Sequence, residues 1–148
     1  MALTTLAYVS EARQGLTLKD LKQILRRARE KNHRAGVSGW LVFDGAYFAQ
    51  ILEGEEGVLE PLLGCIEADP RHRDLRLLLH AGIDRRNFGA TCMGCANLAA
   101  PVHIDTSELR GLLRDAMGTQ QLPLEDAVEL FRVFETFRTP EQASLLAL

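Results

Sequence analysis

The 148-residue sequence lacks several features that would place it in a broad class. It has no apolar run near the ~18 residues that cross a bilayer, so we expect no membrane association. Its first fifteen residues lack a basic start followed by a long apolar stretch, which argues against a signal peptide. The formal net charge of -3 gives no basic surface for phosphates, so we expect no nucleic acid partner.

Cysteine is also scarce, and its arrangement indicates neither a disulfide framework nor a zinc site. Cys65, Cys92 and Cys95 are an odd number, which is typical of a reducing compartment, so we expect a cytoplasmic protein. Cys92 and Cys95 form a C-x-x-C pair, but no second pair and no thioredoxin-type helix accompanies it. We therefore interpret them as core or strand cysteines and expect no bound metal.

Common enzyme motifs are absent too. The sequence contains no G-x-G-x-x-G, Walker loop, H-E-x-x-H or G-x-S-x-G. The paired carboxylates Glu55 and Glu56 precede an expected helix, where they favour its dipole rather than acid–base catalysis. The length suits a single domain with one proper core.

The hydrophobic pattern predicts an α+β fold with the ferredoxin-like order β-α-β-β-α-β, an extra fifth strand, and two C-terminal helices packed on the sheet. The expected strands cover residues 3–10, 40–43, 46–52, 75–83 and 93–98. The expected helices cover residues 17–32, 57–68, 107–117 and 124–137, and the last has an apolar side at Leu130, Phe134 and Phe137.

The first helix ends its apolar side on a polar residue. Thr17 and Asp20 form a capping-box pattern at its start. The apolar stripe then comprises Leu18, Leu21, Ile24, Leu25 and Ala28. Four residues further along the same face is Asn32, whose buried amide must find hydrogen-bond partners.

A second inward polar residue lies in an expected hairpin. Asp44-Gly45 between two apolar runs predicts a two-residue turn. In that register Gln50 lies opposite Gly39, a residue without a side chain. Strand alternation places Gln50 on one face with Phe48 and Leu52.

Tyr8, Asn32 and Gln50 are thus three polar residues that we expect to face the interior. They could satisfy one another in a polar core network. They could instead line a ligand slot between the first two helices, since a phenol and two amides suit a flat heterocycle such as an isoalloxazine ring. The residue types alone leave both interpretations open.

The sequence resembles the BLUF family, blue-light sensors that use FAD, from about Leu3 to Leu98. The matching segments are LAYVSEA at 6–12, LKQILRRAREKN at 21–32, GVSGWLVFDGAYFAQILEGEEG at 36–57, ADPRHRDL at 68–75 and RNFGATCMG at 86–94. The resemblance implies a noncovalent flavin, FAD or else FMN or riboflavin, between the two helices that flank the sheet. It also implies a photosensory domain over 1–98 and a helical extension of the same compact unit over 99–148.

The resemblance assigns roles to individual residues of this chain. Tyr8 matches the photoactive tyrosine, and Gln50 matches the glutamine that links it to the flavin. Asn32 matches the asparagine at the ring's carbonyl edge, and Met93 the methionine that contacts the glutamine in one signalling state. The other implied flavin-binding residues are Ser10, Ile24, Lys31, Leu41, Phe48, Leu52, Ile66, Asp69, Arg71 and His72.

The implied switch is a light-driven transfer of an electron and a proton from Tyr8, followed by rearrangement of Gln50. A glutamine amide suits this role because it has donors and an acceptor and can exchange one bonding pattern for another. One position departs from the family: many members have a tryptophan two residues before the methionine, where this chain has Thr91. Its one tryptophan is Trp40, in the expected hairpin. Signalling by a tryptophan–methionine exchange therefore does not transfer to this chain.

We expect a light sensor, not an enzyme, without a catalytic output domain, because the chain ends soon after its last two helices. Its output would pass through the sheet and these helices to a downstream protein partner, and we expect a homo-oligomer, a dimer or larger. The alternatives are a ferredoxin-like small-ligand binding module, an acylphosphatase-like enzyme without photochemistry, and a flavin enzyme with turnover. A yellow purified protein would favour the sensor over the flavin-free alternatives.

Overall fold

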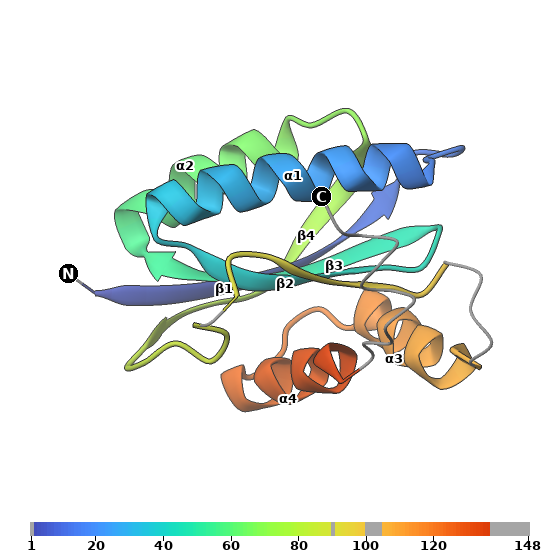
Figure 1. Ribbon diagram of the computed structural model, residues 1–148. Helices are drawn as coiled ribbons and strands as arrows, with labels where there is room; N and C mark the ends of the chain where they lie inside the picture. Colours follow the sequence, from blue (N-terminus) through green and yellow to red (C-terminus); the bar gives the residue numbers. More distant parts are fainter. Residues whose placement is uncertain (1, 90, 100–104, 137–148) are drawn as a thin grey trace.

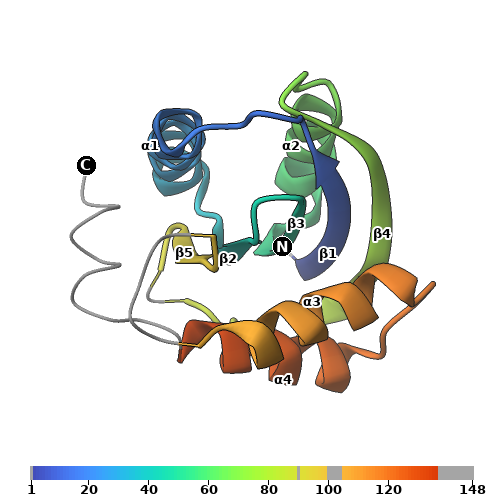
Figure 2. The ribbon, with the colours of Figure 1, turned by 90° about the vertical axis from the view of Figure 1, so that its right-hand side faces the viewer.

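The computed structural model describes residues 2–89, 91–99 and 105–136, which form one sheet with a pair of helices on each face (Figures 1 and 2). The elements are β1 (Leu3–Ala12), α1 (Leu18–Ala35), β2 (Ser38–Phe43), β3 (Tyr47–Glu55), α2 (Glu56–Glu67), β4 (His72–Ile83), β5 (Gly94–Asn97), α3 (Ser107–Gly118) and α4 (Leu124–Glu135). The strand order is β4-β1-β3-β2-β5, with β5 parallel to β2 and the other neighbours antiparallel. The predicted ferredoxin-like sheet with a fifth strand is confirmed.

Helix α1 begins and ends as its local sequence predicts. The Asp20 N–H donates to Thr17 Oγ1 at 3.1 Å, and the Thr17 N–H donates to the Asp20 carboxylate at 2.9 Å, which completes the capping box. Gly36 ends the helix with a left-handed φ of 69°. Asn32 is buried as expected. Leu18 is instead 39% exposed. It is the first residue of the helix, so no preceding helical turn covers its side chain.

The register of the β2–β3 hairpin differs from the prediction by two positions. Gly39 pairs with Leu52, and Leu41 pairs with Gln50. The expected pairing of Gly39 with Gln50 is therefore wrong. Because the shift is an even number of residues, Gln50 keeps its predicted face of the sheet.

The reason for this register lies in the turn. The Asp44 N–H donates to the Tyr47 carbonyl at 3.2 Å, so Asp44 still belongs to the ladder. The Asp44 carboxylate accepts the N–H groups of Ala46 and Tyr47, both at 2.8 Å. The two central turn residues are therefore Gly45 and Ala46, and Gly45 adopts a φ of 97°, which glycine tolerates best.

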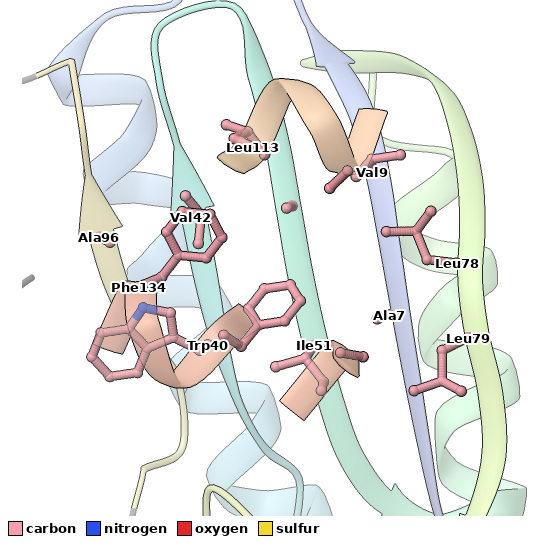
Figure 3. Packing of buried hydrophobic residues seen from close by; sticks show 14 of the residues in the cluster. Ala7, Val9, Trp40, Val42, Ile51, Leu78, Leu79, Ala96, Leu113 and Phe134 are labelled. Atoms are coloured by element: carbon pink, nitrogen blue, oxygen red, sulfur yellow. The ribbon is translucent and has the colours of Figure 1, made fainter. Parts of the chain in front are cut away.

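The sheet separates two hydrophobic cores. Helices α1 and α2 cover one face of the sheet, and α3 and α4 cover the other (Figure 2). Along β1 and β3, alternate residues face opposite sides, so Tyr8 and Gln50 face α1 and α2. On the other side α3 and α4 cover a core that contains Trp40, Ile51, Leu113 and Phe134 (Figure 3). Phe131 belongs to the same core. Phe134 is buried and Leu130 half-buried on the predicted apolar side of α4, whereas Phe137 lies outside the described residues.

Trp40 belongs to this second core, where it packs against β5. It pairs with Gly94 across β2 and β5. A Cβ on Gly94 would lie 2.0 Å from a carbon of the Trp40 ring, so this contact requires glycine. Trp40 lies in the hairpin as expected, and strand alternation turns its side chain to the face of the sheet opposite Gln50.

Within the described part of the chain, no helix has the length and apolar character needed to span a membrane.

Candidate functional site

A cavity of about 730 Å³ lies between α1, α2 and the adjoining face of the sheet. This volume is within the ~300–1,000 Å³ common for ligand and cofactor sites. Its buried floor consists of Tyr8, Asn32, Leu41, Phe48, Gln50 and Leu52. Its more exposed rim includes the charged residues Arg13, Asp20, Arg27, Lys31, Asp69 and Arg71. The cavity thus has a floor for a flat ring and a charged margin.

The cavity brings together most of the residues that the resemblance assigns to the flavin. These are Tyr8, Ile24, Lys31, Asn32, Leu41, Phe48, Gln50, Leu52, Ile66, Asp69, Arg71 and His72. Ser10 and Met93 are not part of the lining, and each instead contacts a lining residue from behind. Their direct contact with a flavin remains a prediction.

Nine further lining residues were not anticipated from the sequence: Arg13, Asp20, Gln23, Arg27, Ala28, Leu62, Cys65, Ala68 and Pro70. A usable signal existed for those on α1. Asp20, Gln23, Arg27 and Lys31 follow one another at intervals of three or four residues, which marks one face of a helix, and Ile24 and Ala28 lie on the same face. No comparable pattern identifies Arg13, which follows β1 in a loop.

Tyr8, Gln50 and Met93 form a hydrogen-bonded series on the cavity floor. Strand pairing places Tyr8 directly opposite Gln50, and the Tyr8 hydroxyl donates to Gln50 Oε1 at 2.5 Å. Gln50 Nε2 donates to Met93 Sδ at 3.2 Å. Because a thioether can accept but not donate, Met93 favours the amide orientation that turns Nε2 towards it.

The phenol of Tyr8 is held in its neutral form. Burial raises its pKa, because desolvation disfavours the phenolate, and the negative charge of Asp69 raises this pKa further. Tyr8 therefore keeps its proton and acts as the hydrogen-bond donor to Gln50.

Asn32 joins the cavity to the segment that precedes β5. Its Nδ2 donates to the Cys92 carbonyl at 3.0 Å. Asn32 also lines the cavity, and its Oδ1 and second N–H have no hydrogen bond with the described residues. One donor and one acceptor thus remain for a bound ring.

His72 and Ser10 support the floor from the β4 side. His72 Nδ1 lies 2.8 Å from Ser10 Oγ, and His72 Nε2 lies 2.5 Å from the Ile66 carbonyl. Because a carbonyl only accepts, Nε2 carries a proton, and in the neutral ring Nδ1 accepts from the Ser10 hydroxyl. These contacts fix the His72 ring, whose centroid lies 6.2 Å from that of Tyr8.

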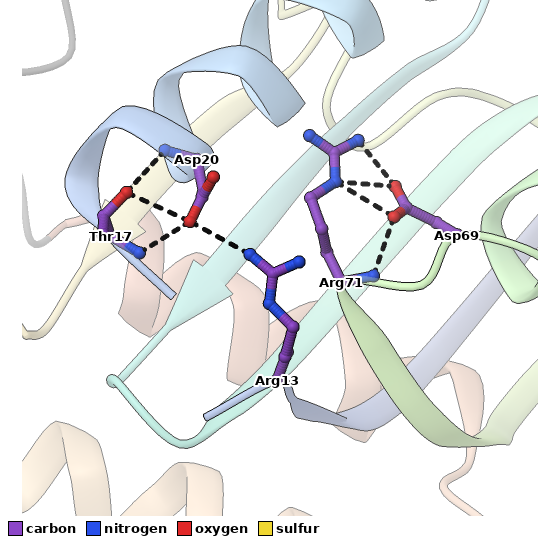
Figure 4. A network of polar contacts seen from close by, with 5 residues as sticks. All are labelled: Arg13, Thr17, Asp20, Asp69 and Arg71. Carbon is purple, nitrogen blue, oxygen red and sulfur yellow. Dashed lines mark hydrogen bonds and ion pairs between the residues drawn. The ribbon is translucent and has the colours of Figure 1, made fainter. Parts of the chain in front are cut away.

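The rim has two ion pairs (Figure 4) and two further cations, Arg27 and Lys31. Arg71 Nη2 lies 2.7 Å from Asp69 Oδ2, and the Arg71 hydrogen bonds lower the pKa of the Asp69 carboxyl. Arg13 Nη2 lies 3.3 Å from Asp20 Oδ2. Arg27 and Lys31 make no ion pair with any residue that the structure describes. Their charges are therefore available to an anionic ligand.

Among the described residues, no group of three or more histidine, cysteine or acidic side chains is placed to hold a metal ion. Cys92 Sγ lies 3.7 Å from His33 Nδ1, and Cys95 is buried in the core on the α1 and α2 side of the sheet.

Comparison with known proteins gives the site a family context. The family of sensors of blue-light using FAD, BLUF, matches residues 3–94. The chain is 32% identical over 133 residues to the blue light- and temperature-regulated antirepressor BluF of Escherichia coli, covering 89% of this chain and 32% of that protein. It is 35% identical over 88 residues to photoactivated adenylate cyclase subunit alpha of Euglena gracilis, covering 60% of this chain and 9% of that protein. The chain thus spans a third or less of the length of these relatives.

The solved dark-state structure of BlrB, a BLUF protein, has the same fold. It superposes with a TM-score of 0.72 at 30% sequence identity, covering 91% of this chain and 97% of that one.

Proposed function

The chain belongs to the BLUF family, sensors of blue light that use FAD, and we propose that its photochemical switch is the Tyr8–Gln50 pair. The observation that carries this proposal is the 2.5 Å hydrogen bond between Tyr8 and Gln50 on the floor of a ring-sized cavity. When bound, FAD supplies the absorption of blue light and, once excited, the power to oxidise a nearby phenol.

The residues around the cavity fit FAD. Apolar side chains of Ile24, Phe48 and Ile66 offer walls for a flat ring. Asn32 offers one donor and one acceptor for the polar edge of such a ring. Arg27 and Lys31 on the rim suit the two phosphates of the dinucleotide.

The chemistry of the switch follows from the bonding of Tyr8. Tyr8 is the one phenol on the lining of the described cavity. If it loses an electron, its hydroxyl becomes strongly acidic, and the proton moves along the existing hydrogen bond to Gln50 Oε1. Return of the electron and the proton restores the phenol, so the lasting change is a new orientation or tautomer of the Gln50 amide.

We propose that the output leaves through the sheet and through α3 and α4 to a downstream protein or a linked domain. Phe131 and Phe134 of α4 pack in the core on the far side of the same strands. A rearrangement at Gln50 therefore acts on strands that both pairs of helices share. Residues 1–98 would form the sensory part, α3 and α4 an extension of the same unit, and the protein a homo-oligomer that signals without catalysing a reaction.

The test is an absorption spectrum of the FAD-loaded protein in darkness and under blue light. The expected result is a flavin spectrum that moves slightly to the red and relaxes in the dark. Tyr8→Phe should keep the flavin but lose the shift, because the ring remains and the transferable proton is removed. A chain that takes up no FAD would instead support the binding-module or acylphosphatase-like alternative, and a normal shift in Tyr8→Phe would remove Tyr8 from the mechanism.

A further inference from the structure

The backbone segment 91–93, which leads into β5, is held at every one of its carbonyl groups. Its three carbonyls each accept one hydrogen bond from a different residue. The donors are, in chain order of the carbonyls, the Gly39 N–H at 3.1 Å, Asn32 Nδ2 at 3.0 Å and Arg29 Nε at 3.0 Å. These hydrogen bonds attach the segment to β2 and to α1 just before it enters β5.

Arg29 is the member of this set that has no other assigned role. It lies on α1 three residues before Asn32, so the two side chains share a face of the helix. It is half-buried, it does not line the cavity, and it makes no ion pair with the described residues. Its guanidinium donates to the Met93 carbonyl, and a charged donor makes such a bond stronger than a neutral one.

Met93 is held by its backbone on one side and touches the switch with its side chain on the other. The Met93 carbonyl accepts from Arg29, and Met93 Sδ accepts from Gln50 Nε2 at 3.2 Å. The sulfur cannot donate, so its closeness to Gln50 makes the reversed amide, with Oε1 towards Met93, the costlier orientation. The difference in energy between the two orientations of the Gln50 amide therefore depends on Met93 Sδ staying next to it.

We propose that Arg29 is a positioning residue of the photoswitch: by holding the Met93 carbonyl, it keeps Met93 Sδ against Gln50 and so sets the preferred orientation of the Gln50 amide. This inference rests on the proposed function. Arg29 does not touch the cavity, so it acts through Met93 and not on the flavin. It adds to the cavity-lining residues of α1 a residue that contacts the segment 91–93.

The experiment uses two matched variants of the FAD-loaded protein. In Arg29→Gln the amide nitrogen stands the same number of bonds from the backbone as the Nε of arginine, so a donor is retained without the charge. In Arg29→Met a methyl group occupies that position, so the length is kept and the donor is removed. Arg26→Met is the control, because Arg26 is an exposed cation of the same helix.

Two quantities are measured: the rate of dark recovery after blue light, and the methyl NMR resonance of Met93 in the dark, assigned with Met93→Leu. We expect Arg29→Met to slow recovery about fivefold, the effect of losing one hydrogen bond, and to shift the Met93 resonance. Arg29→Gln should stay within about twofold of the parent rate because its donor remains. Arg26→Met should change neither quantity.

Three outcomes would overturn the inference. If the parent protein shows the red shift and Arg29→Met matches it in both quantities, Arg29 does not position Met93 and the proposed function still stands. If Arg29→Gln and Arg29→Met change alike, the effect comes from the charge and not from the hydrogen bond. If the parent protein binds FAD but shows no light-induced shift, the proposed function fails and this inference fails with it.

Discussion

The two faces of the sheet use the same strands to build different interiors. On the face covered by α3 and α4, large apolar side chains close the core, and Trp40, Phe131 and Phe134 are at most 1% exposed. On the face covered by α1 and α2, Tyr8 and Gln50 are buried beside a cavity of about 730 Å³. The difference shows how strand alternation lets one face form a closed apolar core while the other keeps a cavity lined by polar side chains.

The functional face also has a different energetic character. Its buried polar groups are costly unless every donor and acceptor is satisfied, so their hydrogen bonds define one arrangement rather than add much stability. The apolar face stabilises the fold through its buried apolar surface area and its packing, and this stabilisation does not depend on any single hydrogen bond. Substitutions on the two faces should therefore separate loss of stability from loss of response.

Gln50→Leu should have the largest effect on the response. The substitution removes both the acceptor for Tyr8 and the donor to Met93, so we expect the light-induced red shift to disappear while FAD stays bound. The unfolding free energy should fall by about 1–3 kcal/mol at most, because the buried Tyr8 hydroxyl loses its partner. Difference spectra and denaturant unfolding measure the two effects, and an undiminished shift would exclude Gln50 from the switch.

Phe134→Ala should have the largest effect on stability. Removing a fully buried ring from the core under α4 should lower the unfolding free energy by about 3–5 kcal/mol. The folded fraction should still show the red shift, because the cavity face is intact. Val133→Ala is the control, since Val133 is 38% exposed and should cost less than about 0.5 kcal/mol. A folded Phe134→Ala protein without the shift would mean that the two faces are tightly coupled.

Asn32→Ala should have an intermediate effect, confined to the cavity face. Losing the donor and acceptor that Asn32 offers to a ring, together with its hydrogen bond to the Cys92 carbonyl, should weaken FAD binding by about 1–3 kcal/mol, measured by calorimetric titration. Asn97→Ala is the matched control, because Asn97 is equally buried but does not line the cavity. Equal FAD affinities in the two variants would place the ring away from Asn32.

The smallest expected effect is that of pH on the response. Because burial raises the pKa of Tyr8 above the ordinary value of 10.0, the phenol stays protonated from neutral pH to pH 10. The folded state binds this proton more tightly than the unfolded chain does. The proton's contribution to the free energy of unfolding is therefore fully present below pH 10 and is lost as the pH rises further. The amplitude of the red shift should be constant over that range; a decline centred below pH 10 would show that Tyr8 is accessible to solvent.

Several parts of this molecule could be predicted from the sequence because they depend on local chemistry. The capping box of Thr17 and Asp20, and the inward face of Asn32, follow from helical periodicity. The inward face of Gln50 follows from strand alternation and survives the register error, since that error is an even number of residues.

Other parts depend on contacts that a linear pattern does not contain. The hairpin register is set by the Asp44 carboxylate, which holds two N–H groups and moves the turn one residue along. The segment 92–93 behind the cavity accepts hydrogen bonds from Arg29 and Asn32 of α1, which are far away in sequence. The rim residue Arg13 reaches the cavity from a loop, where no periodicity indicates a direction.

The contact between Gly94 and the Trp40 ring limits the order in which these two positions can change during evolution. Any side chain at 94 would overlap the indole while the tryptophan is present, since even a Cβ would lie 2.0 Å from it. A smaller residue at 40 must therefore come first, and it would leave a cavity in the core that α3 and α4 cover. We expect the two positions to change together or not at all, so that lineages which keep this tryptophan also keep this glycine.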